Sequence, residues 1–480
     1  MRLGAIIYTL GYGGIILALL MVLPLVQSIW LGHDVLARNF TIGLLLTAFV
    51  SGAMLLSGRS ARKAAAQEIE LVLIIILFWS LLPWVASLPM TAASQVVGLS
   101  QAYFETVSAL TTTGGTVMQY PEIEAAPILL WRSLLGWIGG LWTLVLAVAV
   151  LAPMEVGGLS LTGSPLLQNG EQASLSERLG RPMRLIGPIY TGLTALGVIG
   201  VMAAGGGLFE SFCIALSAIS TTGFVTHSQG LATQFTAFAH LIISTLSLIG
   251  ALSAPALVLL GVGKRMQSLG RDSELRLLAG LIIGYALLSY LILDSLGFGA
   301  ALLQAISLFT TAGFNYLPNT ALQAWPMFWL MLPALFGGMA FSAAGGMKMM
   351  RAIILTKGVA NEVSKLAYPS SVQSLTLDGR RLEDPSFSAI WAYTSLFLLF
   401  LAGGLIIVGL FGIGLEDGWP IVVGALTNSL SITTGLDLSV SFGQMSPYLQ
   451  YFLTVLMIAG RIEILILMML FTSSFWRFTR

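Results

Sequence analysis

The chain has 480 residues and a formal net charge of +1, with 56% hydrophobic residues and only 9% charged ones. A soluble domain carries roughly 25% charged residues, and the mean hydropathy here is +0.91, so the composition excludes a water-soluble protein. The charge gives no indication of a nucleic-acid partner, and the single Cys213 excludes an intrachain disulfide framework or a thiolate metal cluster. The apolar runs are long and continuous rather than alternating, which predicts an all-α integral membrane protein.

Ten apolar stretches are long enough to cross a bilayer, and we expect one spanning helix from each. In chain order they are 5–30, 40–57, 69–88, 128–154, 183–204, 235–262, 275–298, 326–357, 388–411 and 446–472. The first follows Arg2 but runs to about Trp30, which is too long for the apolar region of a signal peptide, and no clear cleavage site follows. We therefore predict a retained first helix.

Four shorter apolar segments lie between pairs of these helices, at 98–111, 208–220, 299–311 and 418–432. At about 1.5 Å per residue, none crosses a hydrocarbon core of about 30 Å. We predict re-entrant half-helices, each followed by an extended return. Irregular backbone at that depth survives only where protein buries it or where it lines a wet cavity.

The same seven-residue phrase, Ser-x-x-x-Thr-(Thr/Ala)-Gly, recurs at 108–114, 217–223, 307–313 and 429–435, next to these segments. Glycine allows the backbone to turn its carbonyl groups inward, and threonine hydroxyls add oxygen ligands or brace the turn. One such motif is explained by close helix packing, but four in register are not. They predict a ring of carbonyl groups that replaces the water shell of a cation.

Helix, half-helix, turn and helix therefore recur four times after a leading helix pair, which predicts four pore repeats around a pseudo-fourfold axis. The predicted units are 1–68 for the leading pair, then 69–160, 161–265, 266–360 and 361–480 for repeats 1 to 4. Lysine and arginine gather in the loops 58–69, 155–182, 263–276 and 357–387, whereas the opposite loops are mostly acidic. This bias predicts that both termini are cytoplasmic and that the turns open outward.

Several stretches resemble one known family. They are Phe104-Glu-Thr-Val-Ser-Ala-Leu-Thr-Thr-Thr-Gly-Gly-Thr-Val117, Trp131-Arg-Ser-Leu-Leu-Gly-Trp-Ile-Gly-Gly140, the Gly/Ser/Ala-rich 337–348 and Gly460-Arg-Ile-Glu-Ile464. With the four turns, they resemble the TrkH-type subunits of bacterial potassium-uptake systems in the Trk/Ktr/HKT superfamily. The resemblance covers about residues 1–475, and the leading helix pair favours the Trk branch over the Ktr branch.

The resemblance implies a potassium-selective filter formed by the last three residues of each motif. These are Thr112, Thr113 and Gly114; Thr221, Thr222 and Gly223; Thr311, Ala312 and Gly313; and Thr433, Thr434 and Gly435. In related plant carriers a serine at the first glycine goes with sodium preference, so Gly114 favours potassium. Asp437, two residues after the fourth glycine, departs from the expected pattern; enriching cations at the outer mouth and capping a loop remain equally open.

The resemblance also implies a gate below the filter, in two parts. The eighth span contains Gly337, Gly338, Gly345 and Gly346, and each costs a continuous helix about 1 kcal/mol relative to alanine. The family places an intramembrane loop there that obstructs the pore; a kinked, closely packed helix is the alternative. The second part is Arg461, in the middle of the last span, where a charge is costly. The family places a matching arginine in the pore as a barrier to cations; a buried ion pair is the alternative, although Glu463 points elsewhere on the helix.

Other polar residues have simpler interpretations. His33, His227 and His240 share no ligand spacing, so we expect no metal site beyond potassium and no cofactor bound by this chain. Glu105 is expected near the start of its half-helix, where a carboxylate is favourable. Arg132 is expected to tie half-helix to helix. We find no nucleotide fingerprint or catalytic triad, and so predict a protein that is not an enzyme.

The function predicted is that of a gated potassium-permeation subunit in the bacterial inner membrane. The alternative is a sodium- or proton-coupled secondary potassium transporter, although few ionisable residues lie near the membrane midplane, where coupling sites are usually found. An intramembrane protease is a third, less supported hypothesis. The resemblance implies a homodimer and a separate cytoplasmic nucleotide-binding ring of the TrkA type. The basic loops 264–276 and 357–381 either dock that ring or are ordinary positive-inside loops.

Overall fold

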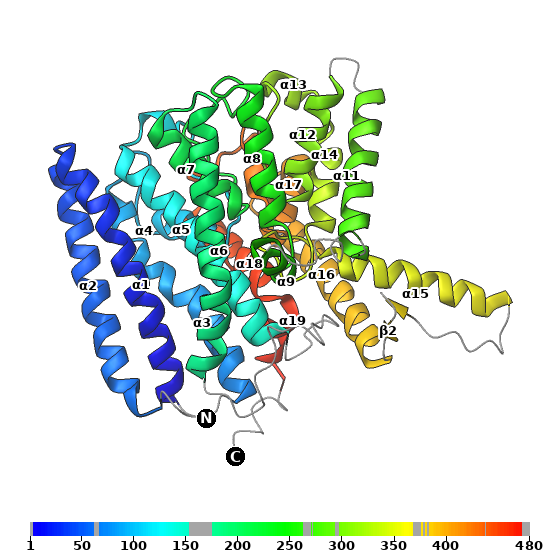
Figure 1. Cartoon of the computed structure of the whole chain (residues 1–480), viewed down its shortest axis with the longest axis horizontal. Helices are drawn as coiled ribbons and strands as arrows, with labels where there is room; N and C mark the ends of the chain where they lie inside the picture. Colours follow the sequence, from blue (N-terminus) through cyan, green and yellow to red (C-terminus); the bar gives the residue numbers. More distant parts are fainter. Residues whose placement is uncertain are drawn as a thin grey trace.

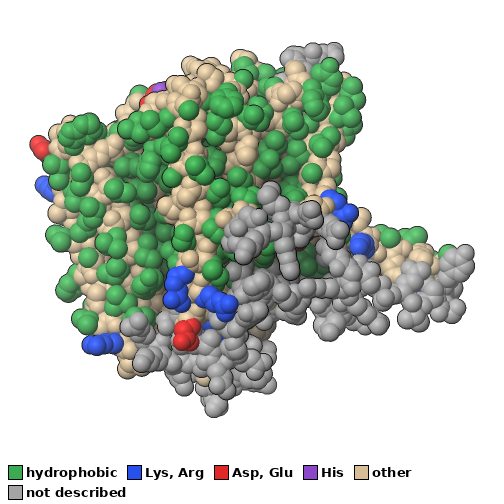
Figure 2. Space-filling model, viewed as in Figure 1, with side chains coloured by type: hydrophobic (Ala, Val, Ile, Leu, Met, Phe, Trp, Pro, Cys, Tyr) green, Lys and Arg blue, Asp and Glu red, His purple; other side chains and the backbone are tan. Residues whose placement is uncertain are grey.

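The structure is a computed structural model, and it describes residues 3–61, 67–152, 175–262, 270, 272–292, 297–367, 376–377, 380–381, 384–436 and 438–472. Within these ranges the chain is helical, apart from turns and one short antiparallel pair, β1 (Thr376–Leu377) and β2 (Arg380–Arg381). Seven of the described helices are long and apolar enough to cross a membrane. Apolar side chains are spread over the face in Figure 2, and several lysine and arginine side chains lie in its lower half. The all-α, multi-pass membrane fold is confirmed.

The helices α1 and α2 form a leading pair at one side of the molecule (Figure 1), and after them the order of helix, short helix and helix recurs four times. The leading pair is α1 (Leu3–Trp30) and α2 (Asp34–Gly58). Repeat 1 contains α3 (Glu68–Ala86), α4 (Leu99–Leu110) and α5 (Ala126–Leu146), which continues as a π-helical turn, Ala147–Leu151. Repeat 2 contains α6 (Leu175–Ala203), α7 (Leu208–Ile219), α8 (Ala237–Gly250) and α9 (Ala254–Val262). Repeat 3 contains α11 (Ser273–Ile292), α12 (Phe298–Phe309), α13 (Asn319–Gln323), α14 (Met327–Phe336) and α15 (Met349–Ala367). Repeat 4 contains α16 (Asp384–Leu410), α17 (Leu415–Leu426), α18 (Pro447–Ile462) and α19 (Ile464–Met469).

The half-helices α4, α7, α12 and α17 have 12 residues each, so each spans about 18 Å, well short of a bilayer. The longer helices that follow two of them begin with side-chain caps. Thr236 Oγ1 accepts a hydrogen bond from Ala239 N (3.3 Å) at α8, and Ser446 Oγ accepts one from Leu449 N (3.4 Å) at α18. These caps satisfy backbone donors that a helix start leaves free.

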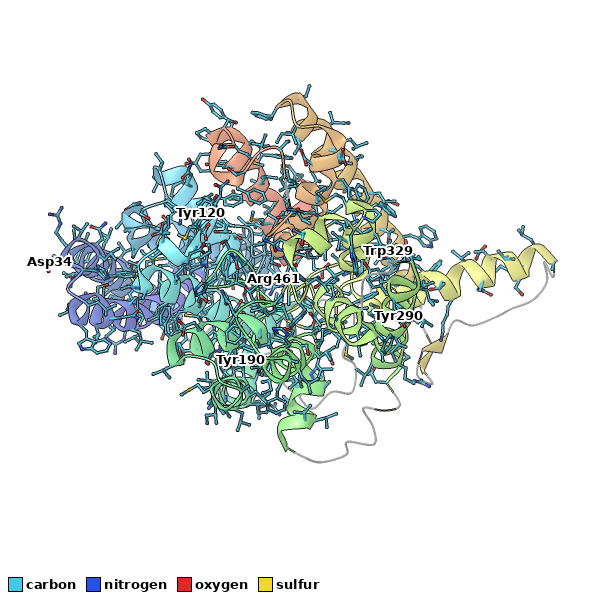
Figure 3. The ribbon with its side chains drawn as sticks, turned by 90° about the horizontal axis from the view of Figure 1, so that it is seen from above. Asp34, Tyr120, Tyr190, Tyr290, Trp329 and Arg461 are labelled. Carbon is cyan, nitrogen blue, oxygen red and sulfur yellow. The ribbon has the colours of Figure 1, made fainter. Side chains whose placement is uncertain are left out.

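The half-helices alternate around a closed ring with the helices that follow them in each repeat, α5, α8, α14 and α18, which we call the inner helices. In order, α4, α5, α7, α8, α12, α14, α17 and α18 each contact the next, and α18 contacts α4 again. The outer helices α3, α6, α11 and α16 pack on the half-helices of their own repeats. Seen from above, Arg461 lies near the middle of the molecule, with the repeats around it (Figure 3). The leading pair packs outside the ring, with α1 against α3 and α5.

Three of the ten predicted spans are not continuous helices. The span 326–357 divides into α14 and α15 around a loop at 337–348, where its glycines predicted an interruption. The other two breaks were not predicted: 235–262 breaks between Gly250 and Ala254, and 446–472 breaks at Glu463.

Tertiary hydrogen bonds account for the first unpredicted break. The carbonyl groups of Gly250 and Ala251 accept hydrogen bonds from Ala343 N and Met339 N of the loop, both at 3.1 Å, instead of from a next helical turn. Pro255 then stands in the first turn of α9, where its missing N–H is not needed. At the second break, Glu463 has φ +70° and pairs with another helix, as described below.

Candidate functional site: a ring of half-helix ends above a buried loop

Three half-helices end in the same way. Just past each helix end a threonine adopts the left-handed conformation, and a glycine two residues later also has positive φ. The threonines are Thr112, Thr221 and Thr311, with φ of +55°, +56° and +57°; the glycines are Gly114, Gly223 and Gly313, with φ of +74°, +80° and +66°. The left-handed conformation costs a non-glycine residue roughly 1–2 kcal/mol, and such strain tends to occur at functional sites.

The motif serine has a local role in two of these three turns. Ser108 Oγ donates to the carbonyl oxygen of Gly115 at 2.6 Å, and Ser307 Oγ donates to that of Phe314 at 2.8 Å. The bond ties the start of the extended return to the last turn of the half-helix. Ser217, at the same place in repeat 2, is buried and its hydroxyl has no partner among the described residues.

The four segments meet around one axis. A methyl group on Gly114 or Gly223 would overlap a carbonyl oxygen of the next repeat, so adjacent segments lie in backbone contact. The oxygens concerned belong to Thr222 and Ala312, respectively. Ser431 N donates to Thr113 O at 3.1 Å and joins repeat 4 to repeat 1. Only glycine fits at these approaches.

The fourth repeat does not follow the predicted register. Its half-helix ends at Leu426 rather than near 432, and the left-handed residue is Asn428, with φ +50°. Ser429 N donates to Gly424 O at 2.8 Å. The matching bonds run from Thr113 to Ser108 (2.8 Å) and from Thr222 to Ser217 (3.0 Å). Ser429 therefore corresponds to Thr113 and Thr222, and Leu430 takes the place of the glycine.

Glycines in the inner helices support the same register. Gly139, Gly250 and Gly460 each lie where an added methyl group would overlap the carbonyl oxygen of the last half-helix residue. Those last residues are Leu110, Ile219 and Leu426, respectively. A hydroxyl pair also repeats two residues apart: Thr111 with Thr113 (2.7 Å), Ser220 with Thr222 (2.8 Å) and Thr427 with Ser429 (2.6 Å).

The predicted fourth filter segment, Thr433, Thr434 and Gly435, therefore lies beyond the ring. The carbonyl oxygen of Thr434 accepts a hydrogen bond from Asn315 Nδ2, and Gly435 faces Asn319. The motif letters recur in the fourth repeat, but the hydrogen bonds that close the turn form five residues earlier. Asp437 lies outside the described residues.

A buried loop lies directly beneath two of the half-helix ends. Gly345 N donates to Thr311 Oγ1 at 2.8 Å, and Gly346 N donates to Thr427 O at 3.0 Å. Gly337 and Gly346 have positive φ, and a methyl group on Gly345 would overlap Thr427 O. The segment 337–348 is thus a non-helical loop, and the kinked-helix alternative is wrong.

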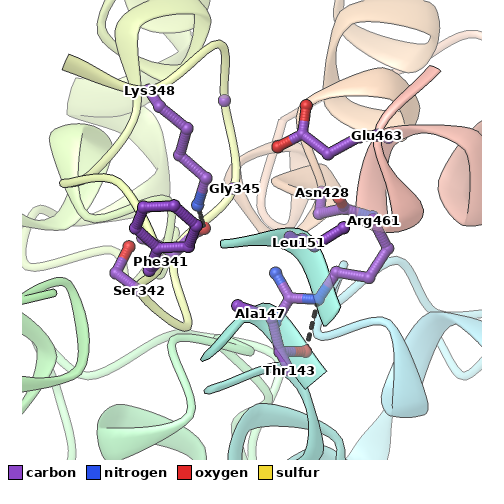
Figure 4. Close-up of a pocket in the computed structure, with 13 residues that line it drawn as sticks. Thr143, Ala147, Leu151, Phe341, Ser342, Gly345, Lys348, Asn428, Arg461 and Glu463 are labelled. Carbon is purple, nitrogen blue, oxygen red and sulfur yellow. Dashed lines mark hydrogen bonds between the residues drawn. The ribbon is translucent and has the colours of Figure 1, made fainter. Parts of the chain in front are cut away.

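The loop faces a small cavity below the ring (Figure 4). The cavity is lined by Thr143, Ala147, Leu151, Phe341, Ser342, Ala344, Gly345, Gly346, Lys348, Asn428, Gly460, Arg461 and Glu463. The lining combines the loop, the π-helical turn after α5 and the break between α18 and α19. A π-helical turn inside a helix often marks a functional site.

Arg461 stands in this cavity. It follows Gly460, which touches the last carbonyl of α17, so it lies just under the ring. Arg461 Nε donates to Thr143 Oγ1 at 2.8 Å (Figure 4), and its second terminal nitrogen has no hydrogen-bond partner. No carboxylate in the described ranges forms an ion pair with it. Glu463 instead pairs with Arg351 at 2.8 Å, so the structure does not support the buried ion-pair alternative.

A buried ion pair joins α4 and α5 of repeat 1. Arg132 lies 3.4 Å from Glu105 and donates to Val225 O at 2.8 Å, which confirms that it ties half-helix to helix and adds a tie to repeat 2. Glu105 lies in the middle of α4 rather than at its start, and it accepts from Val117 N at 2.9 Å. The role predicted for Glu105 was therefore wrong.

A second carboxylate joins the loop between α4 and α5 to the loop between α7 and α8. Glu122 accepts hydrogen bonds from Ser228 N at 2.9 Å and from Ser228 Oγ at 2.7 Å. Partial burial alone would raise the pKa of Glu122, but these hydrogen bonds hold its pKa below the usual value. The carboxylate therefore stays charged in the loop between α4 and α5.

Comparison with known proteins agrees with this geometry. Residues 36–270 and 295–477 match the TrkH family, described as a cation transport protein. This chain belongs to the TrkH family. It is 32% identical to the Trk system potassium uptake protein TrkH of Halomonas elongata, over 99% of this chain and 100% of that one. It is 28% identical to the protein of the same name from Escherichia coli, over 93% of each chain. The fold of this TrkH-family chain matches the crystal structure of the potassium transporter TrkH from Vibrio parahaemolyticus with a TM-score of 0.88, at 26% identity, over 99% of this chain and 100% of that one.

Proposed function

We propose that this chain is a gated potassium-permeation subunit of a Trk-type bacterial uptake system. The observation that carries the proposal is the closed ring of four half-helix ends around one axis. Carbonyl groups arranged in this way replace the hydration shell of a potassium ion, and the negative ends of the half-helices favour a cation. The names of its relatives support potassium as the ion. Transport, rather than catalysis, is the activity we infer.

The proposed filter consists of residues 112–114, 221–223 and 311–313, with 427–430 as its fourth part in place of 433–435. Buried oxygens without partners support this assignment. Thr112 Oγ1 and Thr221 Oγ1 are enclosed at the ring and have no hydrogen-bond partner in the described part of the chain. A buried polar atom without a partner is costly, and a dehydrated cation would supply one. Gly114 in the first segment agrees with potassium preference.

We propose that the loop 337–348 and Arg461 form the gate. The loop stands below the ring, and its backbone is hydrogen-bonded to Thr311 and Thr427. Arg461 and Lys348 both line this cavity, and its one carboxylate, Glu463, forms its ion pair with Arg351 rather than with Arg461. In a site of low dielectric the charge on Arg461 repels a cation strongly. Conduction then requires the loop to leave and the arginine to move or be neutralised.

The remaining assignments follow from the family and the charge pattern. We propose that the chain divides into the units 1–68, 69–160, 161–265, 266–360 and 361–480. We propose that it forms a homodimer in the inner membrane with cytoplasmic termini. We propose a TrkA-like nucleotide-binding ring as its partner. In Figure 1, α1 begins and α19 ends at the same end of the molecule, which supports a common side for the termini. Light scattering of the detergent-solubilised protein tests the dimer, and reporter fusions at each end test the orientation.

The central test is reconstitution of the purified chain into liposomes, with flux measured for potassium, rubidium, sodium and lithium. We expect potassium and rubidium to pass well ahead of sodium and lithium. A flux that depends on an imposed sodium or proton gradient would support coupled transport instead. Absence of potassium flux from both the parent protein and the Arg461→Ala variant would contradict the proposal.

A further inference from the structure

Each repeat contributes one corner to the ring, at the end of its half-helix. The fourth corner, residues 427–430, is built differently from the other three. No glycine stands at its turn, because Leu430 occupies that position. From Leu430 to Thr433 the chain forms a 3₁₀ turn instead of an extended return. A 3₁₀ turn is tighter than an extended segment, and this one carries Ser431 toward the axis.

Distances to three other repeats locate the Ser431 side chain. A methyl group on Gly114 would lie 2.6 Å from Ser431 Cβ, and one on Gly223 would lie 2.7 Å from Ser431 Oγ. A methyl group on Gly313 would also overlap Ser431. Repeats 1 and 3 are the neighbours of repeat 4 in the ring, but repeat 2, which carries Gly223, is opposite. A side chain close to all three glycines stands at the centre.

The Ser431 hydroxyl has nothing to bind there. The residue is fully buried, and its Oγ has no hydrogen-bond partner within the described residues. Its backbone N–H donates to Thr113 O at 3.1 Å, so one carbonyl group of the ring is already engaged. A hydroxyl oxygen can accept a cation as well as a hydrogen bond.

We propose that the Ser431 side chain occupies the ion path at the level of the three ring glycines and sets both the permeation rate and the size discrimination. An ion and a side chain cannot share the axis, so conduction requires the 430–433 turn to withdraw. Ser431 Oγ then becomes one of the oxygen ligands of the passing ion. This inference rests on the proposed function of the ring.

A size series at this position tests the inference in liposomes. Ser431→Gly is expected to raise potassium flux about tenfold, equivalent to about 1.4 kcal/mol of barrier, and to admit caesium more readily. Ser431→Ala should lie between glycine and the parent, and Ser431→Val should fall below the parent. Equal flux and equal caesium-to-potassium ratios across the series would overturn the inference.

A second measurement uses a variant that leaves the size of the side chain in the 430–433 turn almost unchanged. Ser431→Cys is nearly isosteric, and a thiol on the ion path should let silver ions block potassium flux. The parent, which keeps the buried Cys213, is the matched control and should remain open. Flux that silver does not block in Ser431→Cys would overturn the inference. The variant Gly223→Ala separates the Ser431 inference from the proposed function of the ring. If Gly223→Ala loses flux while the Ser431 variants change nothing, only the Ser431 inference fails. If substitutions at neither position change the flux, the ring is not the ion pathway.

Discussion

Repeat 4 has the same backbone arrangement as repeats 1 to 3 at the end of its half-helix, but different residue types occupy the equivalent positions. All four half-helices have the same length, and in repeats 1, 2 and 4 the last carbonyl packs on a glycine of the inner helix. Three corners place a threonine at the left-handed position, whereas the fourth places Asn428 there. The comparison shows that the hydrogen-bond register, rather than the recurrence of motif letters, identifies equivalent positions in a repeat protein.

The level below the ring is asymmetric as well. After the packing glycine, repeats 1 and 2 carry the small residues Gly140 and Ala251, whereas repeat 4 carries Arg461. In repeat 3 the inner helix opens into the loop 337–348. The loop is hydrogen-bonded to the half-helix ends of repeats 3 and 4. The proposed gate thus lies under the corner that departs most from the others.

The strongest test compares two glycines that both end a motif copy and both have positive φ. In Gly223→Ala the new methyl group meets the backbone oxygen of Ala312, whereas in Gly435→Ala it meets the side chain of Asn319 at 2.6 Å, which can move. We expect potassium uptake to fall by at least about tenfold, a barrier of about 1.4 kcal/mol, in Gly223→Ala and much less in Gly435→Ala. Rubidium uptake in cells that lack other potassium transporters measures this. Equal losses of uptake in the two variants would indicate that residues 433–435, as the motif predicted, form the fourth part of the filter.

Arg461→Ala should raise basal leak several-fold, because it removes one of the two basic side chains, Arg461 and Lys348, that line the cavity below the ring. Arg461→Lys is the matched control, since it keeps the charge and loses only the fork geometry. Flux from liposomes with and without the proposed TrkA-like partner is the measurement. Unchanged leak in Arg461→Ala under both conditions would remove Arg461 from the gate.

Asn428→Ala should destabilise the fourth corner by about 2 kcal/mol. Asn428 Nδ2 donates to Thr113 Oγ1 at 2.9 Å and to Met457 O at 2.8 Å, so the variant removes two hydrogen bonds between buried groups. Thr434→Ala, in the segment that the motif favoured, should be nearly neutral. Thermal unfolding in detergent compares the two variants, and a larger loss in Thr434→Ala would contradict the assigned register.

We expect the smallest changes in stability from alanine substitutions of the three serines that share one motif position. Ser108→Ala and Ser307→Ala each remove a hydrogen bond to a buried carbonyl and should lower the free energy of unfolding by about 1 kcal/mol. Ser217→Ala removes a hydroxyl that has no partner in the described structure, so we expect little change. Equal losses in all three variants would show that the serine acts through something other than this bond.

The sequence alone was sufficient for several features that depend on local chemistry. Composition identified lipid as the solvent, segment length distinguished half-helices from spanning helices, and glycine content marked the loop 337–348. The same local signals marked Arg461 as a charge in the middle of a span. Its partners could not be predicted, because Thr143 lies more than three hundred residues away in the chain.

The register of the fourth corner, the breaks after Gly250 and at Glu463, and the central position of Ser431 became visible only once the chain was folded. Each depends on which N–H meets which carbonyl across repeats: Ser431 with Thr113, and Met339 with Ala251. A backbone group in lipid must find a partner somewhere, but the sequence does not say whether that partner lies in the next turn or in another repeat. Long-range pairing, which local residue preferences do not encode, decided these features.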